Sequence, residues 1–347
     1  MISLNGIEKV IKKGNRVVHT LKGITLNIEQ GEIFGILGHA GAGKSALIRT
    51  INFLDPPSRG SVVIDSCDLS TLSATGIREA RRQIGMIFEH FNLFNTRTVF
   101  ENIAFPLELS GISKNKIATQ VRALLSLTSL SDKAEAYPYQ LNSEQKQRVA
   151  IARALANQPK VLLCEEATHG LDQKAKQSIL ELLREINSQL KLTILLITHE
   201  IEVIKSICNR LAVLHKGEIV EQNTVIEWYS KPKTDASKAF IRAETQLDIP
   251  ASLGNRLLTE PCENTNTILR LSFSKSAAEE PFIALVIQQF KLSVNIIQAH
   301  LENFQIHSVG IMIVEMVGER TEVHQAITFL EHKDIHIEVI GYVARTA

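Results

Sequence analysis

The stretch Gly38-His39-Ala40-Gly41-Ala42-Gly43-Lys44-Ser45 decides the fold of this chain. It fits the phosphate-binding loop pattern G-x-x-x-x-G-K-[ST] without a mismatch. The apolar run 33–37 before it is of strand type, and residues 46–50 after it are suited to open a helix. A helix that begins here points unpaired backbone N–H groups at the loop, and its dipole favours an anion. The stretch therefore predicts a strand–loop–helix unit that binds phosphate groups.

The residue types inside this loop suit phosphate chemistry. Its glycines let the backbone curl around phosphate oxygens without a Cβ clash. Lys44 is expected to reach the β- and γ-phosphates, and the Ser45 hydroxyl to ligate Mg²⁺. The rest of the loop is predicted to line the same phosphates: Gly38, His39, Ala40, Gly41, Ala42 and Gly43.

The composition is that of a soluble globular protein. The chain has 347 residues, of which 44% are hydrophobic and 22% are charged, so one large or two ordinary domains are expected. Lysine and arginine total 38 against 37 aspartates and glutamates, which gives a formal charge of +1. This balance carries neither the basic footprint of a nucleic-acid-binding protein nor a polybasic membrane anchor.

Cysteine usage and hydropathy favour a reducing cytoplasm. The four cysteines have neither a paired nor a metal-ligand spacing: Cys67, Cys164, Cys208 and Cys262. We expect no signal peptide, because Met1 leads straight into a polar-interrupted segment. No apolar run approaches the roughly 18 residues that span a bilayer. If the protein works at a membrane, other chains supply the membrane part.

The apolar pattern of residues 1–244 predicts a doubly wound α/β core. Residues 1–30 alternate apolar and polar side chains, as antiparallel strands do. Residues 161–164 and 193–198 are apolar almost throughout, as buried parallel strands are. A helical spacing between these two runs completes a strand–helix–strand repeat: Ile179, Leu182, Leu183 and Ile186. Helical patterns with few strand signals predict a helical insert at about residues 91–158.

A second, smaller domain is predicted after a linker. Residues 245–266 contain Pro250, Gly254 and Pro261 among polar residues and are typical of a linker. Residues 267–347 then show strand and helix patterns in the order β-α-β-β-α-β, which is that of a ferredoxin-like domain. The predicted fold class is thus an α/β phosphate-loop domain with a helical insert, followed by a small α+β ferredoxin-like domain.

Three further stretches accompany the phosphate loop. Residues 141–153 read Leu-Asn-Ser-Glu-Gln-Lys-Gln-Arg-Val-Ala-Ile-Ala-Arg, residues 161–172 read Val-Leu-Leu-Cys-Glu-Glu-Ala-Thr-His-Gly-Leu-Asp, and residues 197–200 read Ile-Thr-His-Glu. Together with the loop they resemble the nucleotide-binding subunit of an ABC transporter over residues 1–240. With residues 81–93 and the ferredoxin-like tail, the chain is more narrowly similar to the ATP-binding subunit of the bacterial methionine importer.

The resemblance implies a role for several residues around ATP. Glu166 matches the catalytic carboxylate that polarises the attacking water, and His199 matches the switch histidine that senses the γ-phosphate. Glu89 and Glu165 match positions that would hold Mg²⁺ together with Ser45. The signature segment, which starts a helix, would contact a γ-phosphate through Asn142, Ser143, Glu144 and Gln145.

The resemblance also implies partners and a location. Two copies would close head to tail over two ATP molecules, and this closure would drive two membrane permease subunits. A substrate-binding lipoprotein would take part indirectly, and the tail would be a regulatory, methionine-binding domain. The chain would lie peripherally on the cytoplasmic face of the inner (plasma) membrane. The apolar stretch 91–109 would dock a coupling helix of a permease, fill the core of the insert, or do both.

The sequence departs from the family pattern around the nucleotide. The usual signature Leu-Ser-Gly-Gly-Gln is replaced by residues 141–145, so Glu144 brings a carboxylate to the place of the partner's γ-phosphate. Two anions about 4 Å apart repel by about 4 kcal/mol at an effective dielectric of 20. Glu89 replaces a glutamine and Glu165 an aspartate. Further departures are Ile11 at the adenine-stacking position, Ala46, and His169-Gly170.

Three hypotheses remain after the sequence analysis. The first is an ATPase subunit that hydrolyses ATP for methionine import. The second is a catalytically impaired ATP-binding regulatory subunit of the same kind of complex, because the departures surround one ligand and a homodimer carries them at both sites. The third is a soluble, non-transport ABC protein acting on DNA or ribosomes, which the single phosphate loop and the neutral charge disfavour.

Overall fold

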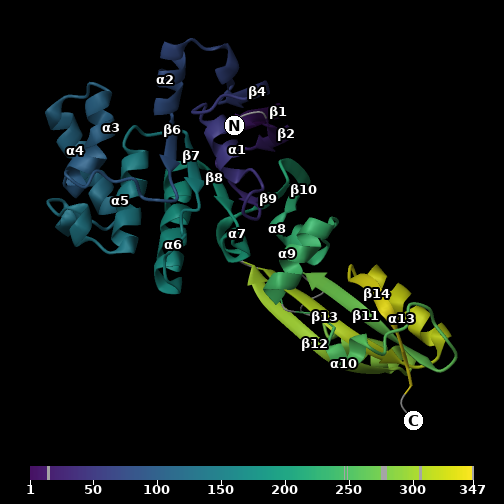
Figure 1. The fold of residues 1–347 in the computed structure, drawn as a ribbon. Coiled ribbons are helices and arrows are strands. Elements are labelled where there is room, and N and C mark those ends of the chain that lie inside the picture. The colour runs from purple at the N-terminus through teal and green to yellow at the C-terminus, as the bar shows by residue number, and fades with distance from the viewer. Residues whose placement is uncertain (14–15, 246, 248, 275–279, 305–306, 346–347) are drawn as a thin grey trace. The chain divides into compact units, whose positions relative to one another are not determined.

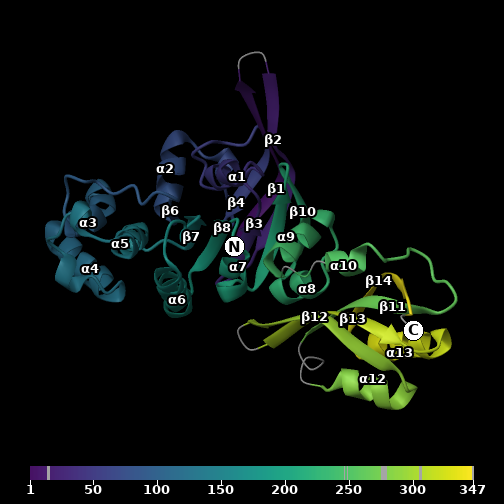
Figure 2. The same ribbon diagram turned by 60° about the horizontal axis from the view of Figure 1, so that its bottom comes forward.

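Residues 1–13, 16–245, 247, 249–274, 280–304 and 307–345 are described in this computed structural model. Their contacts divide the chain into two units, Met1–Gln222 and Asn223–Ala347, and Figures 1 and 2 show the ribbon from two sides. Residues 246 and 248 of the predicted linker lie outside the described part. Within that part, no helix combines the length and the apolar character needed to cross a membrane.

The first unit contains a six-stranded sheet. Its strands are β3 (Ile33–Leu37), β6 (Ile84–Ile87), β7 (Val161–Glu165), β8 (Thr193–Thr198), β9 (Arg210–His215) and β10 (Glu218–Thr224). They lie in the order β10-β9-β3-β8-β7-β6, and the pairs from β9 to β6 are parallel. Because β3, β7 and β8 are buried over their whole length, both faces need apolar side chains. The predicted buried parallel strands are thus confirmed.

A second, antiparallel sheet shares the core of this unit. It is formed by β1 (Ile2–Lys13), β2 (Arg16–Ile28), β4 (Arg59–Ile64) and the short β5 (Cys67–Asp68) in the order β2-β1-β4-β5. The alternate apolar residues of β1 and β2 are buried, and they pack in one cluster with Phe34 of β3 and Leu195 of β8. The antiparallel strands that the alternation in residues 1–30 predicted are thus confirmed.

Helices flank the parallel sheet and extend past its β6 edge. Those beside the sheet are α1 (Lys44–Ile51), α2 (Ala74–Arg82), α6 (Gln173–Leu190) and α7 (Ile201–Ile207), whereas α3 (Val99–Leu109), α4 (Lys114–Leu127) and α5 (Ser143–Leu155) gather beyond β6 (Figures 1 and 2). Helix α6 buries the four apolar residues whose spacing predicted it, and α3–α5 have a core of their own. Single 3₁₀ turns span Leu69–Thr71, Ser131–Lys133 and Pro138–Gln140.

The ferredoxin-like prediction is confirmed in the second unit. Its elements follow as β11 (Thr265–Ser274), α12 (Phe282–Phe290), β12 (Ser293–Phe304), β13 (His307–Val317), α13 (Arg320–His332) and β14 (His336–Ala344). The antiparallel sheet has the order β12-β13-β11-β14. Helices α12 and α13 pack against one face, where Leu269, Leu271 and Phe273 of β11 enter a buried cluster.

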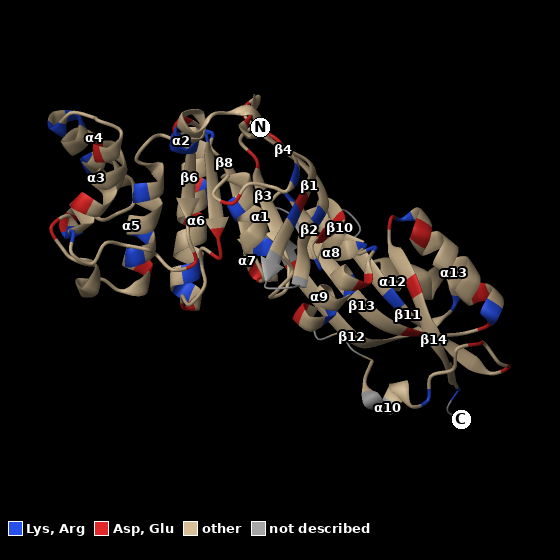
Figure 3. Cartoon of the chain, turned by 45° about the horizontal axis from the view of Figure 1, so that its top comes forward, with Lys and Arg blue, Asp and Glu red and all other residues tan. Residues whose placement is uncertain are grey.

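The other face of this sheet carries helices that the sequence analysis assigned to residues 1–244. These are α8 (Val225–Ser230) and α9 (Asp235–Thr245), and a short α10 (Ala251–Gly254) follows in the predicted linker. Helix α8 contacts β11 and β13, and the Tyr229 ring packs edge-on against Phe304 at 4.9 Å between ring centres. Burial of Trp228 and Tyr229 explains why the second compact unit begins before residue 245. Basic and acidic residues are interspersed along the elements (Figure 3).

Candidate nucleotide-binding site

The carboxyl ends of neighbouring parallel strands bring the predicted site residues to one edge. The register pairs the last residue of β3 with the last of β8, and Glu165 at the end of β7 with Ile197. The loop 38–45, Glu165 and His199 therefore leave the sheet side by side, where α/β folds bind ligands. Glu89 follows β6 at the same edge, since the last residue of β6 pairs with β7.

The phosphate loop has a backbone that requires glycine at two kinds of position. Gly41 and Gly43 have φ angles of 79° and 109°, which lie in the region that L-residues avoid. At Gly38, a Cβ atom would lie 2.8 Å from the carbonyl oxygen of Leu214. Helix α1 begins directly after Gly43. The predicted strand–loop–helix unit is thus present, with the helix N-terminus facing the loop.

Lys44 is already held by three oxygen atoms in this arrangement. Its Nζ donates hydrogen bonds to the carbonyl oxygens of Gly38 at 2.7 Å and His39 at 3.3 Å. The same Nζ lies 3.3 Å from Oε1 of Glu166, and both side chains are about nine-tenths buried. Phosphate groups entering the loop would have to draw the ammonium group away from these oxygens.

Glu166 is the most constrained acid of this edge. It has a φ of 47°, and its carboxylate accepts a hydrogen bond from Thr198 Oγ1 at 3.1 Å. His199 Nδ1 lies 3.0 Å from both carboxylate oxygens. Burial by itself raises the pKa of Glu166, but the hydrogen bond from His199 and the charge of Lys44 outweigh it, so the pKa lies below its ordinary value. The carboxylate is ionised at neutral pH.

The oxygen atoms expected to hold Mg²⁺ are compatible with that ion. Glu165 is only 6% exposed, and its carboxylate has no hydrogen bond or ion pair with the described residues, so it suits a cation. Ser45 lies in the first turn of α1. No cluster of three or more His, Cys, Asp or Glu side chains suited to a metal occurs in the described ranges. Mg²⁺ keeps several waters and takes one or two protein oxygens besides phosphates, and the Ser45 hydroxyl and the Glu165 carboxylate are ligands of that kind.

The altered signature still begins a helix. Asn142 is the N-cap of α5, and its Oδ1 accepts from the backbone N–H of Gln145 at 2.8 Å. The Gln145 side chain accepts in return from the backbone N–H of Asn142 at 3.1 Å. This capping box uses the oxygen of the Asn142 amide and leaves its NH₂ group available as a donor. Ser143 is the first residue of the helix.

The Glu144 carboxylate is held by two side chains, Arg148 and Ser178. Its Oε1 lies 3.0 Å from Nε of Arg148 and accepts a hydrogen bond from Ser178 Oγ at 2.7 Å. Arg148 also donates to Ser178 at 2.6 Å and to the carbonyl oxygen of Thr128 at 3.1 Å. The carboxylate is thus paired with a cation. The i, i+4 spacing of Glu144 and Arg148 is the sequence signal for this pair, whereas nothing in the sequence indicates Ser178 of α6.

Two other departures also lie beside predicted positions. The His169 ring is 5.9 Å from the His199 ring, measured between centres, in an edge arrangement. Ile11 pairs with Val18 across the β1–β2 ladder, and Val18 is 45% exposed. The two offer an aliphatic surface where the family has an aromatic residue.

Comparison with known proteins agrees with this geometry. Residues 21–169 match the family model "ABC transporter", and residues 267–339 match the "NIL domain" model. The chain is 46% identical over 344 residues to a methionine import ATP-binding protein of Photobacterium profundum, which covers 99% of this chain and 100% of that protein. It is 47% identical over 347 residues to the protein of the same name from Chromohalobacter salexigens, with full coverage of both.

This chain belongs to the family of methionine import ATP-binding proteins. The resemblance found in the sequence is confirmed, and so is the fold class. A dimeric ATP-binding cassette, solved in a post-hydrolysis state with ADP and phosphate, superposes with a TM-score of 0.61 at 34% identity. It covers 65% of this chain and 99% of its own. The roles of individual residues in this member of the family stay predictions.

Proposed function

We propose that this chain is the ATP-hydrolysing subunit of an ABC importer for methionine. The observation that carries the proposal is the cluster of Lys44, Glu166 and His199 beside the phosphate loop. The names of its full-length relatives supply the substrate. Two copies would work with two membrane permease subunits, and indirectly with a substrate-binding lipoprotein, on the cytoplasmic face of the inner membrane.

In this function, phosphate binding and the release of Glu166 are one event. The N–H groups of loop 38–45 and the ammonium of Lys44 would take the β- and γ-phosphates. When Lys44 turns to them, Glu166 loses one cation but keeps Thr198 and His199, which fix its direction. A fixed, ionised carboxylate beside the γ-phosphate polarises a water for attack.

Metal binding would fall to side chains at the same edge. Ser45, Glu89 and Glu165 are the residues that would hold Mg²⁺, and the ion would neutralise charge on the phosphates. Of the three, Glu165 is the best suited to bind the ion, because it is buried and its carboxylate has no hydrogen bond or ion pair within the described residues. The protein's share of the work is to orient the phosphates and the water.

The ion pair at the signature favours a working enzyme over the impaired alternative. A free carboxylate at Glu144 would repel the partner's γ-phosphate, whereas one paired with Arg148 and Ser178 leaves little net charge there. The N-terminus of α5 and the amide of Asn142 then remain to contact the phosphate. Glu89 and Glu165 keep the impaired alternative open.

A groove in the first unit suits the coupling helix of a permease. It has a volume of about 560 Å³ and runs between β6, the segment that follows it, and α3. Aromatic side chains line it, and the rings of Phe94 and Phe105 meet edge-on at 4.7 Å between centres. Arginine side chains also line it, among them Arg78 and Arg82. We expect a helix with apolar and acidic side chains to dock here.

The test is ATP-driven methionine uptake by proteoliposomes that contain the chain and its permease subunits. Uptake and ATP turnover should both fall at least about 100-fold in Glu166→Gln, while Glu181→Gln, which changes an exposed glutamate of α6, should match the wild type. Wild-type turnover no higher than that of Glu166→Gln would support the impaired subunit instead.

Co-purification with ribosomes or DNA and not with a permease would support the non-transport protein. Calorimetry with methionine and the full chain tests the expected methionine-binding role of the tail.

A further inference from the structure

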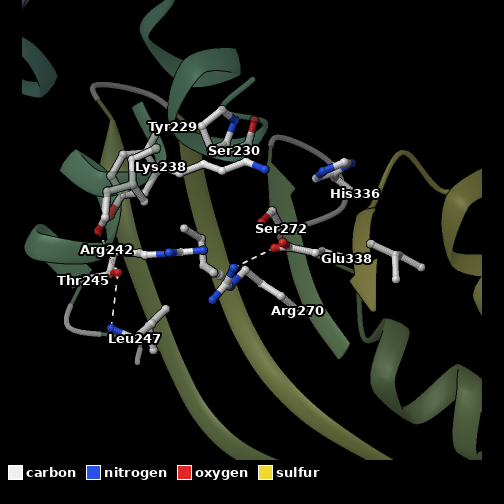
Figure 4. Close-up of a pocket in the computed structure, with 14 residues that line it drawn as sticks. Tyr229, Ser230, Lys238, Arg242, Thr245, Leu247, Arg270, Ser272, His336 and Glu338 are labelled. Carbon is white, nitrogen blue, oxygen red and sulfur yellow. Dashed lines mark hydrogen bonds and ion pairs between the residues drawn. The ribbon is translucent and has the colours of Figure 1, made fainter. Parts of the chain in front are cut away.

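A pocket of about 200 Å³ lies inside the second unit, between α9 and the sheet (Figure 4). The sheet face that lines it is opposite the face covered by α12 and α13, because Arg270 and Ser272 alternate with the buried Leu269, Leu271 and Phe273. The register forms a cross-strand row there: Ser272 pairs with residues of β13 and β14 on either side, Ile311 and His336. The pocket is therefore built by the fold and is not a gap between loops.

Two cations of α9 reach this pocket without partners. Lys238 and Arg242 are one helical turn apart, and Figure 4 shows both side chains extending toward the strands. Neither side chain has a hydrogen bond or an ion pair with any residue that the structure describes. The acidic residue of the pocket lining, Glu338, does not pair with them, because its Oε2 lies 2.6 Å from Nη1 of Arg270.

The other polar groups do not cancel this charge. Burial and the charge of Lys231 hold the pKa of His336 below its ordinary value, although Glu338 opposes the effect. Its ring is therefore neutral at neutral pH. Ser272 is only 5% exposed, and its hydroxyl has no hydrogen-bond partner within the described ranges. Its oxygen is not sealed from solvent, so the hydroxyl is accessible from the pocket and can donate to a ligand.

The remaining walls of the pocket are apolar. They include Ile241 and Leu247 on one side and Ile311 and Ile337 on the other. The first three are each at least 94% buried. Inorganic phosphate would leave these walls without contacts, and an amino acid would bring an ammonium group close to Lys238 and Arg242. The chemistry of the walls and the charges together favours an organic anion without an amine.

We propose that this pocket binds a small organic carboxylate with a short apolar chain. The carboxylate lies between Lys238 and Arg242, the Ser272 hydroxyl donates to it, and the chain packs on Ile241 and Ile311. Each cation contributes one charge-assisted hydrogen bond. Because Arg242 is exposed to water and Lys238 is half-buried, we expect loss of either cation to weaken binding about tenfold and not more. This site is separate from the nucleotide site and does not depend on ATP hydrolysis.

The first experiment titrates hexanoate into the full-length chain with ¹³C-labelled isoleucine methyl groups. Saturable shifts of the Ile241 and Ile311 methyl signals are expected, and hexanamide of the same length should bind at least about tenfold more weakly. Equal affinity for hexanoate and hexanamide, or the absence of saturable shifts, would overturn the proposal. The same shifts produced by methionine at the affinity of hexanoate would also overturn it, because the site would then accept a zwitterion.

Matched variants locate the binding within the pocket. Lys238→Gln and Arg242→Gln should each weaken hexanoate about tenfold, whereas Arg256→Gln, which removes an exposed cation of the same unit outside the pocket, should have no effect. Ile311→Trp fills the cavity and should abolish binding. If that variant does not fold, Ser272→Val removes the donor with little change in volume and should weaken hexanoate severalfold. Unchanged affinity in both cation variants would contradict the proposal.

Discussion

The nucleotide edge and the pocket of the second unit use their charges in opposite ways. At the edge, Lys44, Glu166 and His199 are already bound to one another. In the pocket, Lys238 and Arg242 have no side-chain partner among the described residues. Both places join cations to a sheet and a helix, yet only one of them satisfies those cations internally.

Because of this difference, the two sites respond to an anion in different ways. A ligand at the nucleotide edge must replace existing partners, so its binding moves Lys44 and changes the surroundings of Glu166. An anion between Lys238 and Arg242 meets two cations that have no ion pair among the described residues, so it need not break one to bind there. The first arrangement suits a site whose state must change, and the second suits a site that only holds its ligand.

The largest effect is expected from breaking the pairing at the nucleotide edge. Lys44→Ala removes the cation that phosphate groups would take over, so the affinity for ATP should fall about 100-fold, measured by calorimetry on the purified chain. Lys160→Ala is the matched control, because it breaks an exposed ion pair with Asp65 instead. Equal affinity in both variants would mean that the loop backbone alone holds the nucleotide.

The pair at the signature gives the next effect. Arg148→Met leaves Glu144 without its cation at the N-terminus of α5, so ATP turnover in the assembled complex should fall about tenfold. The double variant Glu144→Gln with Arg148→Met should recover most of the loss, and Arg122→Met on the exposed face of α4 should change nothing. If removing the carboxylate gives no recovery, Arg148 acts through packing alone.

A smaller effect is expected on the affinity of the pocket for hexanoate. Glu338→Gln releases Arg270 from its ion pair and makes the lining more positive. Hexanoate should then bind about threefold more tightly, because the new cation is partly screened by water. Glu260→Gln removes an exposed acid of the same unit and serves as the control. Weaker binding in Glu338→Gln would show that the ion pair shapes the pocket and does not merely neutralise it.

The smallest effect concerns stability in acid. The pKa of Glu166 is lowered in the folded chain, so its charged form contributes stability above the ordinary carboxyl pKa of 4.5. That contribution disappears as the pH falls through the folded value. Between about pH 5 and pH 3, the urea midpoint should therefore fall more in the wild type than in Glu166→Gln. Parallel curves would show that Lys44 and His199 do not stabilise the carboxylate.

Much of the fold could be predicted because its signals are local. The loop pattern at residues 38–45, the apolar runs of β7 and β8 and the alternation in residues 1–30 depend only on near neighbours in the chain. The place of α8 and α9 could not be predicted in this way. Burial of Trp228 and Tyr229 against a sheet that begins at Thr265 is a long-range choice, and the proline-containing stretch between them suggested a boundary there.

In the candidate site, too, local patterns were predicted and contacts between distant parts of the chain were missed. The loop residues and the acids after β7 are predicted from their patterns, because phosphate and Mg²⁺ chemistry demand particular residue types at fixed spacings, and the structure brings them to one edge of the sheet. The partners of Glu144 were missed, since Ser178 lies on another helix and only the spacing of Arg148 hints at the pair. The predicted repulsion between Glu144 and a γ-phosphate therefore left out Arg148, the cation that pairs with Glu144 in the fold.

The sequence alone was enough to establish the α/β class and the ferredoxin-like tail, and to predict the residues around ATP. These follow from periodicity and motif spacing, which act over a few residues. The three-dimensional arrangement was needed to show that Glu166 is bound by Lys44 and His199 and that Glu144 is paired with Arg148. It was also needed to show that Lys238 and Arg242 line one pocket with Ser272 and have no ion pair among the described residues. Each of these facts depends on which side chains meet across strands and helices, and charges interact over distances in space, not along the chain.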